Sequence, residues 1–167
     1  LNRRGFEEEA SAALAANAGQ RALVGVLTVD LDHFKKINDS FGHAAGDAVI
    51  RIFGELVRQT MPEGTIAGRI GGEEFALLLT DTDSRSLRNY AEIIRIGIKS
   101  MCAGKLPEGI DPSLSIGMDI ATPDVPLHDL LRRADAALYE SKRAGRNRAT
   151  MAPSDLRSIS PKLGAVS

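Results

Sequence analysis

The chain has 167 residues, a length typical of one domain, and its hydrophobic content of 43% is enough for one core. Lys and Arg total 21 against 22 Asp and Glu, so the near-neutral charge excludes the broad positive field of a general nucleic-acid-binding or anionic-membrane-binding protein. The single cysteine, Cys102, excludes an internal disulfide and a multi-cysteine zinc site. These features predict one compact domain in a reducing compartment, with the cytoplasm as the default location.

The longest apolar stretch is too short to cross a bilayer as a helix. It covers residues 22–29, less than half of the roughly 20 residues that a membrane-spanning helix needs. No leader with a charged and an apolar region opens the chain, and the first residue is Leu1 rather than Met. We therefore expect an excised piece of a longer protein, with no membrane segment in this piece.

Apolar periodicity and turn residues divide the chain into helices and strands. Asn2 is a helix-capping residue, and three glutamates follow where the helix dipole favours acids. The β-branched run at 22–29 is typical of a strand covered on both faces, and Gly71-Gly72 is typical of a tight hairpin with positive φ angles. The predicted elements, in chain order, are a helix up to 17, a strand over 22–29, helices over 34–40 and 46–59, strands over 65–70 and 74–80, a helix over 84–102, a strand over 114–120 and a helix over 127–144.

This order of elements predicts an α+β fold with a central, mainly antiparallel sheet flanked by helices. We expect residues 1–151 to form this one domain. Residues 152–167 are rich in serine, proline and small residues and have no amphipathic pattern. They therefore predict a flexible C-terminal tail.

Two acidic clusters fall where predicted strands end or turn. Asp30 and Asp32 follow the first strand, and Glu73 and Glu74 follow the Gly-Gly pair of the hairpin. Strand ends and turns share one rim of a sheet, where carboxylates and a backbone carbonyl form the oxygen-rich ligand set that Mg²⁺ prefers. Each cluster alone is also typical of solvated acidic residues, so it is their combination that favours a site.

Longer motifs surround both clusters, and together they cover nearly the whole chain. They are LNRR at 1–4, DLDHFKKINDSFGHAAGD at 30–47, GGEEF at 71–75, SIG at 115–117, ADAALY at 134–139 and KRAGRN at 142–147. The sequence thus resembles the GGDEF-domain diguanylate cyclases, in the GGEEF variant of the motif that names the family. The resemblance implies the palm-like nucleotidyl cyclase fold.

The activity that this resemblance implies is the condensation of two GTP molecules into cyclic di-GMP, with release of two pyrophosphates. Each 3′-hydroxyl attacks the α-phosphate of the other nucleotide, so two half-sites meet across a two-fold axis in a homodimer. Because the sequence has no coiled-coil pattern, we expect the isolated domain to be mostly monomeric. The resemblance also implies a missing upstream sensory or regulatory domain, and a cytoplasmic location that includes the cytoplasmic part of a membrane-anchored sensor.

The resemblance further assigns metal ligands and catalytic residues. Asp30, the Leu31 carbonyl, Glu73 and Glu74 match the positions that hold two Mg²⁺ or Mn²⁺ ions in the family. The cations would offset charge on the triphosphate and on the attacking oxygen, which makes Asp30, Glu73 and Glu74 the implied catalytic residues. The Glu74 carboxylate can also help deprotonate the 3′-hydroxyl.

Asn38 and Asp47 match the pair that reads guanine in the family. A carboxylate can accept hydrogen bonds from both the N1–H and the exocyclic amine of guanine, a pair of donors that adenine lacks. Outside the motif, the same two residues are equally typical of a turn cap and a helix start.

Four residues match phosphate-binding positions. Phe34 and Lys35 begin a predicted helix, whose free backbone amides bind anions. Lys142 and Arg146 match the cations that hold the β- and γ-phosphates. Asp135 lies two helical turns before Lys142, a spacing that allows it to orient the Lys142 side chain.

The sequence departs from the family pattern at the inhibitory site. Many members carry Arg-x-x-Asp shortly before the Gly-Gly turn, where the product binds and inhibits. Pro62 and Thr65 stand at the Arg and Asp positions of this chain. Proline cannot form the two-pronged grip of a guanidinium, so we predict no inhibitory site of this kind.

Three functions are open at this point. An active diguanylate cyclase is favoured because every matched metal and phosphate position is present. The alternative is a catalytically silent GTP-binding regulatory module of a larger signalling protein. The third function is that of a related nucleotidyl transferase with another substrate. It is disfavoured because Asn38 and Asp47 match the guanine-reading pair.

Overall fold

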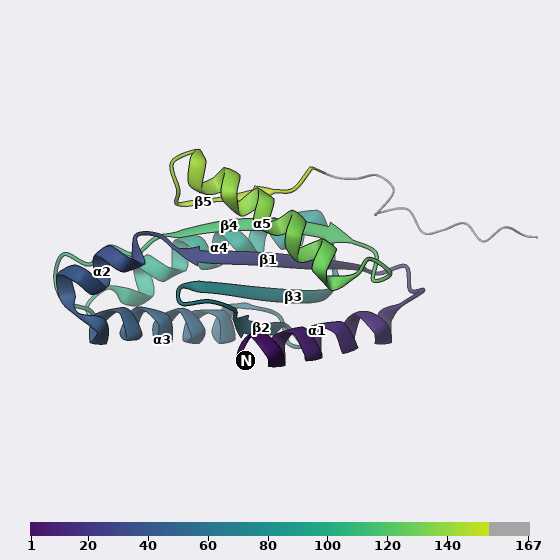
Figure 1. The fold of residues 1–167 in the computed structure, drawn as a ribbon, viewed down its shortest axis with the longest axis horizontal. Helices are drawn as coiled ribbons and strands as arrows, with labels where there is room; N and C mark the ends of the chain where they lie inside the picture. The colour runs from purple at the N-terminus through teal and green to yellow at the C-terminus, as the bar shows by residue number, and fades with distance from the viewer. Residues whose placement is uncertain (154–167) are drawn as a thin grey trace, which may run out of the picture.

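The computed structural model of the protein describes residues 1–153, which form five strands and five helices (Figure 1). None of these helices combines the length and the apolar character needed to span a membrane. The strands are β1 (Leu23–Leu31), β2 (Ile66–Arg69), β3 (Glu74–Thr82), β4 (Leu114–Ala121) and β5 (Arg148–Met151). The helices are α1 (Arg3–Asn17), α2 (Phe34–Phe41), α3 (His43–Thr60), α4 (Ser84–Cys102) and α5 (Leu127–Arg143).

The strands form one sheet in the order β2-β3-β1-β4-β5. β1 lies at its centre and pairs antiparallel with β3 and β4, while β2 pairs antiparallel with β3 (Figure 1). β5 pairs parallel with β4 at the other edge. The predicted α+β fold with a mainly antiparallel sheet is therefore confirmed.

Both faces of the sheet are covered, which explains the continuous apolar run of β1. Val24 and Val26 belong to the core between the sheet and helices α1 and α5. Leu27 and Val29 belong to the core between the sheet and helices α3 and α4. Neighbouring residues of a strand point to opposite faces, so a strand between two helical layers is apolar at every position.

The predicted boundaries hold to within a few residues for most elements. The Asn2 side chain caps α1 by accepting from the amide of Gly5, as expected for a capping asparagine. The helix predicted from 46 begins at His43, because a left-handed Gly42 alone separates α2 from α3. Strand β5 is not among the predicted elements, because its four residues begin with an arginine and show no strand pattern.

The first residue of the predicted C-terminal tail, Ala152, packs against the sheet instead of being flexible. Ala152 is buried, and its amide donates to the Met118 carbonyl at 2.7 Å. Residues 154–167 of the predicted tail lie outside the described residues.

Helix α5 packs so closely on β4 that one position admits no side chain. A Cβ added at Gly117 would overlap the carbonyl oxygen of Ala134 and the backbone nitrogen of Leu138. Both obstacles are backbone atoms of α5, so the helix itself would have to move. This contact fixes the height of α5 above the strand ends, where the acidic clusters lie.

We expect Gly117→Ala to lower the free energy of unfolding by roughly 3 kcal/mol, the upper end of the usual cost of overpacking a core. Gly54→Ala is the matched control, because Gly54 is exposed inside α3 and an added Cβ meets nothing within 4 Å. That substitution should stabilise the protein by about 0.5–1 kcal/mol. Urea unfolding followed by circular dichroism measures both, and equal stability of Gly117→Ala and the parent would contradict the close packing.

Candidate functional site

The pairing register places two predicted site residues opposite one another at the end of the sheet. Asp30 on β1 pairs with Glu74 on β3, so both side chains leave the same face. That face is the one covered by α5, and the Lys142 ammonium at the end of α5 lies 2.7 Å from Asp30 Oδ2. Three elements that are distant in sequence therefore meet at one cluster of charges.

The hairpin between β2 and β3 brings in Glu73 and fixes Glu74. The Glu73 carbonyl accepts from the Leu31 amide at 3.1 Å, which ties the hairpin to the end of β1. The Glu74 carbonyl accepts from the amides of Ile70 and Gly71, at 2.8 and 3.2 Å. The GGEEF segment is thus a turn held by backbone hydrogen bonds on both sides.

The predicted reason for the Gly-Gly pair is wrong. Neither Gly71 nor Gly72 has a positive φ angle, so the turn does not depend on the left-handed region. Instead, a Cβ at Gly71 would collide with the carboxylate of Glu74, which folds back over the turn. A side chain at Gly71 would therefore displace the Glu74 carboxylate from this position, whereas Gly72 has open space around it.

Burial and mutual repulsion set the protonation of these carboxylates. Burial raises the pKa of Asp30, and Lys142 opposes this shift, while Asp32 and Glu74 add to it. Burial also raises the pKa of Glu73, and the neighbouring charges of Asp30 and Glu74 raise it further. Neighbouring acidic charges thus disfavour the ionised forms of Asp30 and Glu73, and a bound cation would relieve that repulsion.

The acids do not by themselves enclose a metal ion. Among residues 1–153, no three His, Cys, Asp or Glu side chains are grouped tightly enough to hold one. Lys142 pairs directly with Asp30, and Glu74 is exposed. The donor set fits an open site, in which water and substrate oxygens complete the ligands of a hard cation.

Asp32, which directly follows β1, has a structural role. Asp32 is 3% exposed, and its carboxylate accepts from the hydroxyls of Ser113 and Ser115, each at 2.7 Å, and from the amide of Asn147 at 3.1 Å. Its own amide donates to the Ser113 carbonyl. With both carboxylate oxygens satisfied, Asp32 joins the end of β1 to the start of β4 and to the turn after α5.

The two predicted guanine-reading residues lie on neighbouring helices. Asn38 on α2 is half-buried, and a Cβ at Gly46 on α3 would collide with its Oδ1 and crowd the ring of Phe34. The missing side chain of Gly46 therefore makes room for Asn38 beside Asp47, the next residue along α3, which is exposed. Phe34 is buried beneath this pair.

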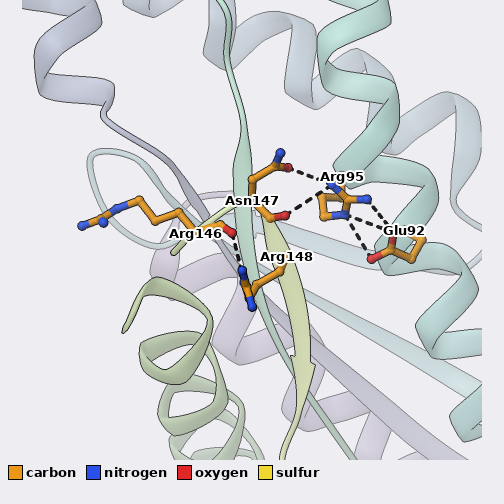
Figure 2. Close-up of polar contacts among 5 residues, drawn as sticks. All are labelled: Glu92, Arg95, Arg146, Asn147 and Arg148. Carbon is orange, nitrogen blue, oxygen red and sulfur yellow. Dashed lines mark hydrogen bonds and ion pairs between the residues drawn. The ribbon is translucent and has the colours of Figure 1, made fainter. Parts of the chain in front are cut away.

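The predicted phosphate-binding cations have different surroundings. Lys35 is exposed at the first turn of α2, which follows β1 directly. Arg146 is exposed in the turn after α5, and its side chain extends away from the neighbouring polar cluster in Figure 2. Lys142 pairs directly with Asp30, and the expectation that Asp135 orients it stays a prediction.

The region of the missing inhibitory motif is a shallow hollow of about 780 Å³ beside β2, which Pro62 and Thr65 help to line. The Thr65 hydroxyl donates to the Pro62 carbonyl at 2.8 Å, so it is used within the turn. Arg69, close by, donates from its guanidinium to the Gly72 carbonyl at 2.6 and 3.1 Å. These contacts leave Arg58 as the guanidinium that lines the hollow.

Comparison with known proteins agrees with this arrangement. A sequence model described as "Diguanylate cyclase, GGDEF domain" matches residues 1–148. The chain belongs to the GGDEF-domain family. Diguanylate cyclase A of Treponema denticola is 35% identical over 138 residues, which are 82% of this chain and 37% of that protein. The probable diguanylate cyclase DgcT of Escherichia coli is 37% identical over 153 residues, 89% of this chain and 33% of that protein.

Solved structures of GGDEF domains share the fold. The active GGEEF domain of a diguanylate cyclase from Vibrio cholerae has a TM-score of 0.84 at 32% identity, over 93% of this chain and 99% of that one. The GGDEF domain of DgcB from Caulobacter crescentus, in complex with c-di-GMP, also has a TM-score of 0.84, at 34% identity and over 92% of both chains. The chain spans about a third of the length of the two curated relatives, and nearly all of these two solved domains.

The ion pair between Lys142 and Asp30 should contribute to stability. Lys142→Met removes the cation and leaves the buried Asp30 beside Asp32 and Glu74. Without divalent cations at pH 7, we expect a loss of about 1–3 kcal/mol in the free energy of unfolding. Lys36→Met is the control, because Lys36 is an exposed α2 lysine that makes no ion pair among residues 1–153.

The loss of stability in Lys142→Met should become smaller as the pH falls. Removing Lys142 raises the pKa of Asp30 further above its unfolded value, so the folded state holds its proton more tightly. A carboxyl of this kind destabilises the fold above its raised pKa, and the penalty disappears as the pH falls through that pKa. Urea unfolding in EDTA should show the gap between variant and parent narrowing from pH 7 towards acid, and a gap that widens would contradict this assignment.

Proposed function

We propose that the protein is a diguanylate cyclase that condenses two GTP molecules into cyclic di-GMP and two pyrophosphates. The observation that carries this proposal is the meeting of Asp30, Glu74 and Lys142 at one end of the sheet. This cluster combines acids that suit a divalent cation with an ammonium group that suits a phosphate. It lies within a chain whose family and fold are those of the GGDEF domains.

Asp30, the Leu31 carbonyl, Glu73 and Glu74 would hold Mg²⁺ or Mn²⁺, with two ions per active site. Such ions polarise the phosphoryl oxygens and lower the pKa of a bound hydroxyl. Burial and neighbouring acidic charges raise the pKa values of Asp30 and Glu73, which supports this assignment, because a bound cation relieves that repulsion. Without a bound cation, the charge of Lys142 offsets that of Asp30. With GTP bound, Lys142 would also pair with the triphosphate.

In the proposed reaction, the 3′-oxygen of one GTP forms a bond to the α-phosphorus of the other. The bond from that phosphorus to the bridging oxygen of pyrophosphate breaks, and the hydroxyl proton leaves to a base. Glu74 is the proposed acceptor of this proton, because it is exposed at the rim and lies opposite Asp30. Lys142 and Arg146 would hold the β- and γ-phosphates, which leave as pyrophosphate, and Lys35 with the first amides of α2 would add further contacts to the triphosphate.

Asn38 and Asp47 are the proposed guanine-reading pair. Asp47 is exposed and therefore available to accept from the N1–H and the amine of the base. Asn38 is held between α2 and α3 above Gly46, so its amide starts from a fixed position. The buried Phe34 supports this corner from below.

The proposed reaction needs a second copy of the chain. Each site holds one GTP, so the two sites must face each other across a two-fold axis. We propose a transient homodimer, with the isolated domain mostly monomeric, acting in the cytoplasm. An upstream regulatory domain would then control how often two domains meet.

Glu74→Gln tests the proposed base and metal ligand. The amide keeps the shape of the side chain but removes its charge, so turnover of GTP with Mg²⁺ should fall at least about 100-fold, while GTP binding changes much less. Glu63→Gln is the control, since Glu63 is exposed before β2 and lies outside the cluster. The measurement is cyclic di-GMP formation by chromatography with a parallel nucleotide titration. Equal turnover in Glu74→Gln and the parent would remove the role of Glu74, and no product from the parent would favour a silent regulatory module.

Asp47→Ala tests the reading of guanine. We expect GTP affinity to fall by roughly ten- to a hundredfold, the usual effect of deleting one charged hydrogen-bond partner. ITP lacks the exocyclic amine, so the preference of the parent for GTP over ITP should shrink in the variant. Asp39→Ala, at an exposed position of α2, is the control and should leave that preference unchanged. A GTP/ITP preference that survives in Asp47→Ala would place the base elsewhere.

A further inference from the structure

The turn that carries Arg146 has an unusual backbone. Gly145, Arg146 and Asn147 have φ angles of 110°, 65° and 45°, so three successive residues lie in the left-handed region. Glycine adopts this region freely and asparagine tolerates it, but arginine disfavours it. Such a conformation persists only where the surrounding structure holds it in place.

Asp32 holds one side of this turn. Its Oδ2 accepts from the Asn147 amide at 3.1 Å, and it is itself held by the hydroxyls of Ser113 and Ser115. Asp32 is 3% exposed, so this hydrogen bond is shielded from water. The backbone after Arg146 is therefore anchored to the same strand end that presents Asp30.

Arg95 of α4 holds the other side, as Figure 2 shows. Its Nη1 donates to Asn147 Oδ1 at 2.8 Å and to the Asn147 carbonyl at 3.3 Å. The Glu92 carboxylate fixes the same guanidinium through Nε and Nη2, at 2.8–3.1 Å. The Arg148 Nε donates to the Arg146 carbonyl at 3.1 Å. Asn147 is thus gripped through its amide, its carbonyl and its side chain at once.

The grip leaves the Arg146 side chain free. Within residues 1–153 its guanidinium makes no hydrogen bond or ion pair, and in Figure 2 it extends away from Arg95 and Glu92. We propose that Arg95 and Asp32 are positioning residues, which hold the strained turn so that Arg146 is presented to the β- and γ-phosphates. This inference rests on the proposed function, because it takes the phosphate-binding role of Arg146 from there.

A positioning role for Arg95 predicts different binding results from a role in fold stability alone. If Arg95 acts through Arg146, its loss should weaken binding of a nucleoside triphosphate and spare a monophosphate, which lacks the phosphates that Arg146 contacts. Loss of Arg95 should also weaken triphosphate binding little further once Arg146 has been removed, because the effects of two substitutions that act through one contact are not additive. A purely structural residue would lower stability and weaken both nucleotides alike.

The test is a set of binding titrations with 3′-deoxyguanosine triphosphate and the matching monophosphate. Both lack the attacking hydroxyl, so binding is measured without turnover. Arg95→Met should weaken triphosphate binding about tenfold and change monophosphate binding by less than about twofold. Arg88→Met, an exposed arginine two turns earlier on α4, is the matched control and should change neither.

Two further variants complete the design. In the Arg146→Ala background, adding Arg95→Met should weaken triphosphate binding by less than about twofold. Asn147→Asp keeps an acceptor oxygen for Arg95 and should retain most of the affinity, whereas Asn147→Ala should match Arg95→Met. Thermal unfolding of each variant confirms that folded proteins are compared, and the Asn147 pair carries the test if Arg95→Met does not fold.

Several outcomes would overturn the proposal. Unchanged triphosphate binding in Arg95→Met, equal weakening of both nucleotides, or full additivity with Arg146→Ala would each do so. A parent protein that prefers the triphosphate but forms no cyclic di-GMP from GTP overturns the proposed cyclase activity and leaves this inference standing. A parent that binds both nucleotides equally overturns the phosphate-binding role of Arg146 and the inference with it.

Discussion

The buried end of β1 is the constraint on which both the fold and the candidate site depend. Two carboxylates separated by one residue, Asp30 and Asp32, are 5% and 3% exposed there. A buried charge without partners is costly, so each acid requires groups from other elements. Asp30 takes the Lys142 ammonium from α5, and Asp32 takes two serine hydroxyls and the Asn147 amide. The ion pair of Asp30 and the hydrogen bonds of Asp32 therefore fix the positions of α5, the start of β4 and the turn into β5 relative to β1.

The parts of this arrangement that are local in sequence could be predicted. The Asn2 cap, the helix over 84–102 and the apolar run of β1 each follow from residues that are neighbours in the chain. The contacts that join distant segments could not. Arg95 and Asn147 are 52 residues apart, and no pattern in either segment indicates their hydrogen bonds. Gly71 was correctly placed in the hairpin but for a wrong reason, because the side chain that needs its space is visible only in three dimensions.

The candidate site residues were identified from the resemblance to the family and not from periodicity. The structure adds which of them are exposed and which are buried. Asp47, Glu74 and Arg146 are exposed, whereas Asp30 is buried and Asn38 is half-buried. Exposed charges are hydrated at little cost while no nucleotide is bound, and the buried groups keep fixed positions. The proposed reaction between two copies of the site would need both properties, since the exposed groups of each site would become enclosed only when the copies meet.

The hairpin gives a physical reason to expect that the face beside β2 binds a guanine nucleotide weakly. Arg69 donates to the Gly72 carbonyl, so its guanidinium supports the turn that carries Glu73 and Glu74. A ligand that recruited Arg69 would have to break that support and would loosen the acids of the candidate site. The Thr65 hydroxyl is bound to the Pro62 carbonyl, and Pro62 offers no donor at all. A nucleotide bound at this hollow would therefore depend on the Arg58 guanidinium, the one arginine among the residues that line it.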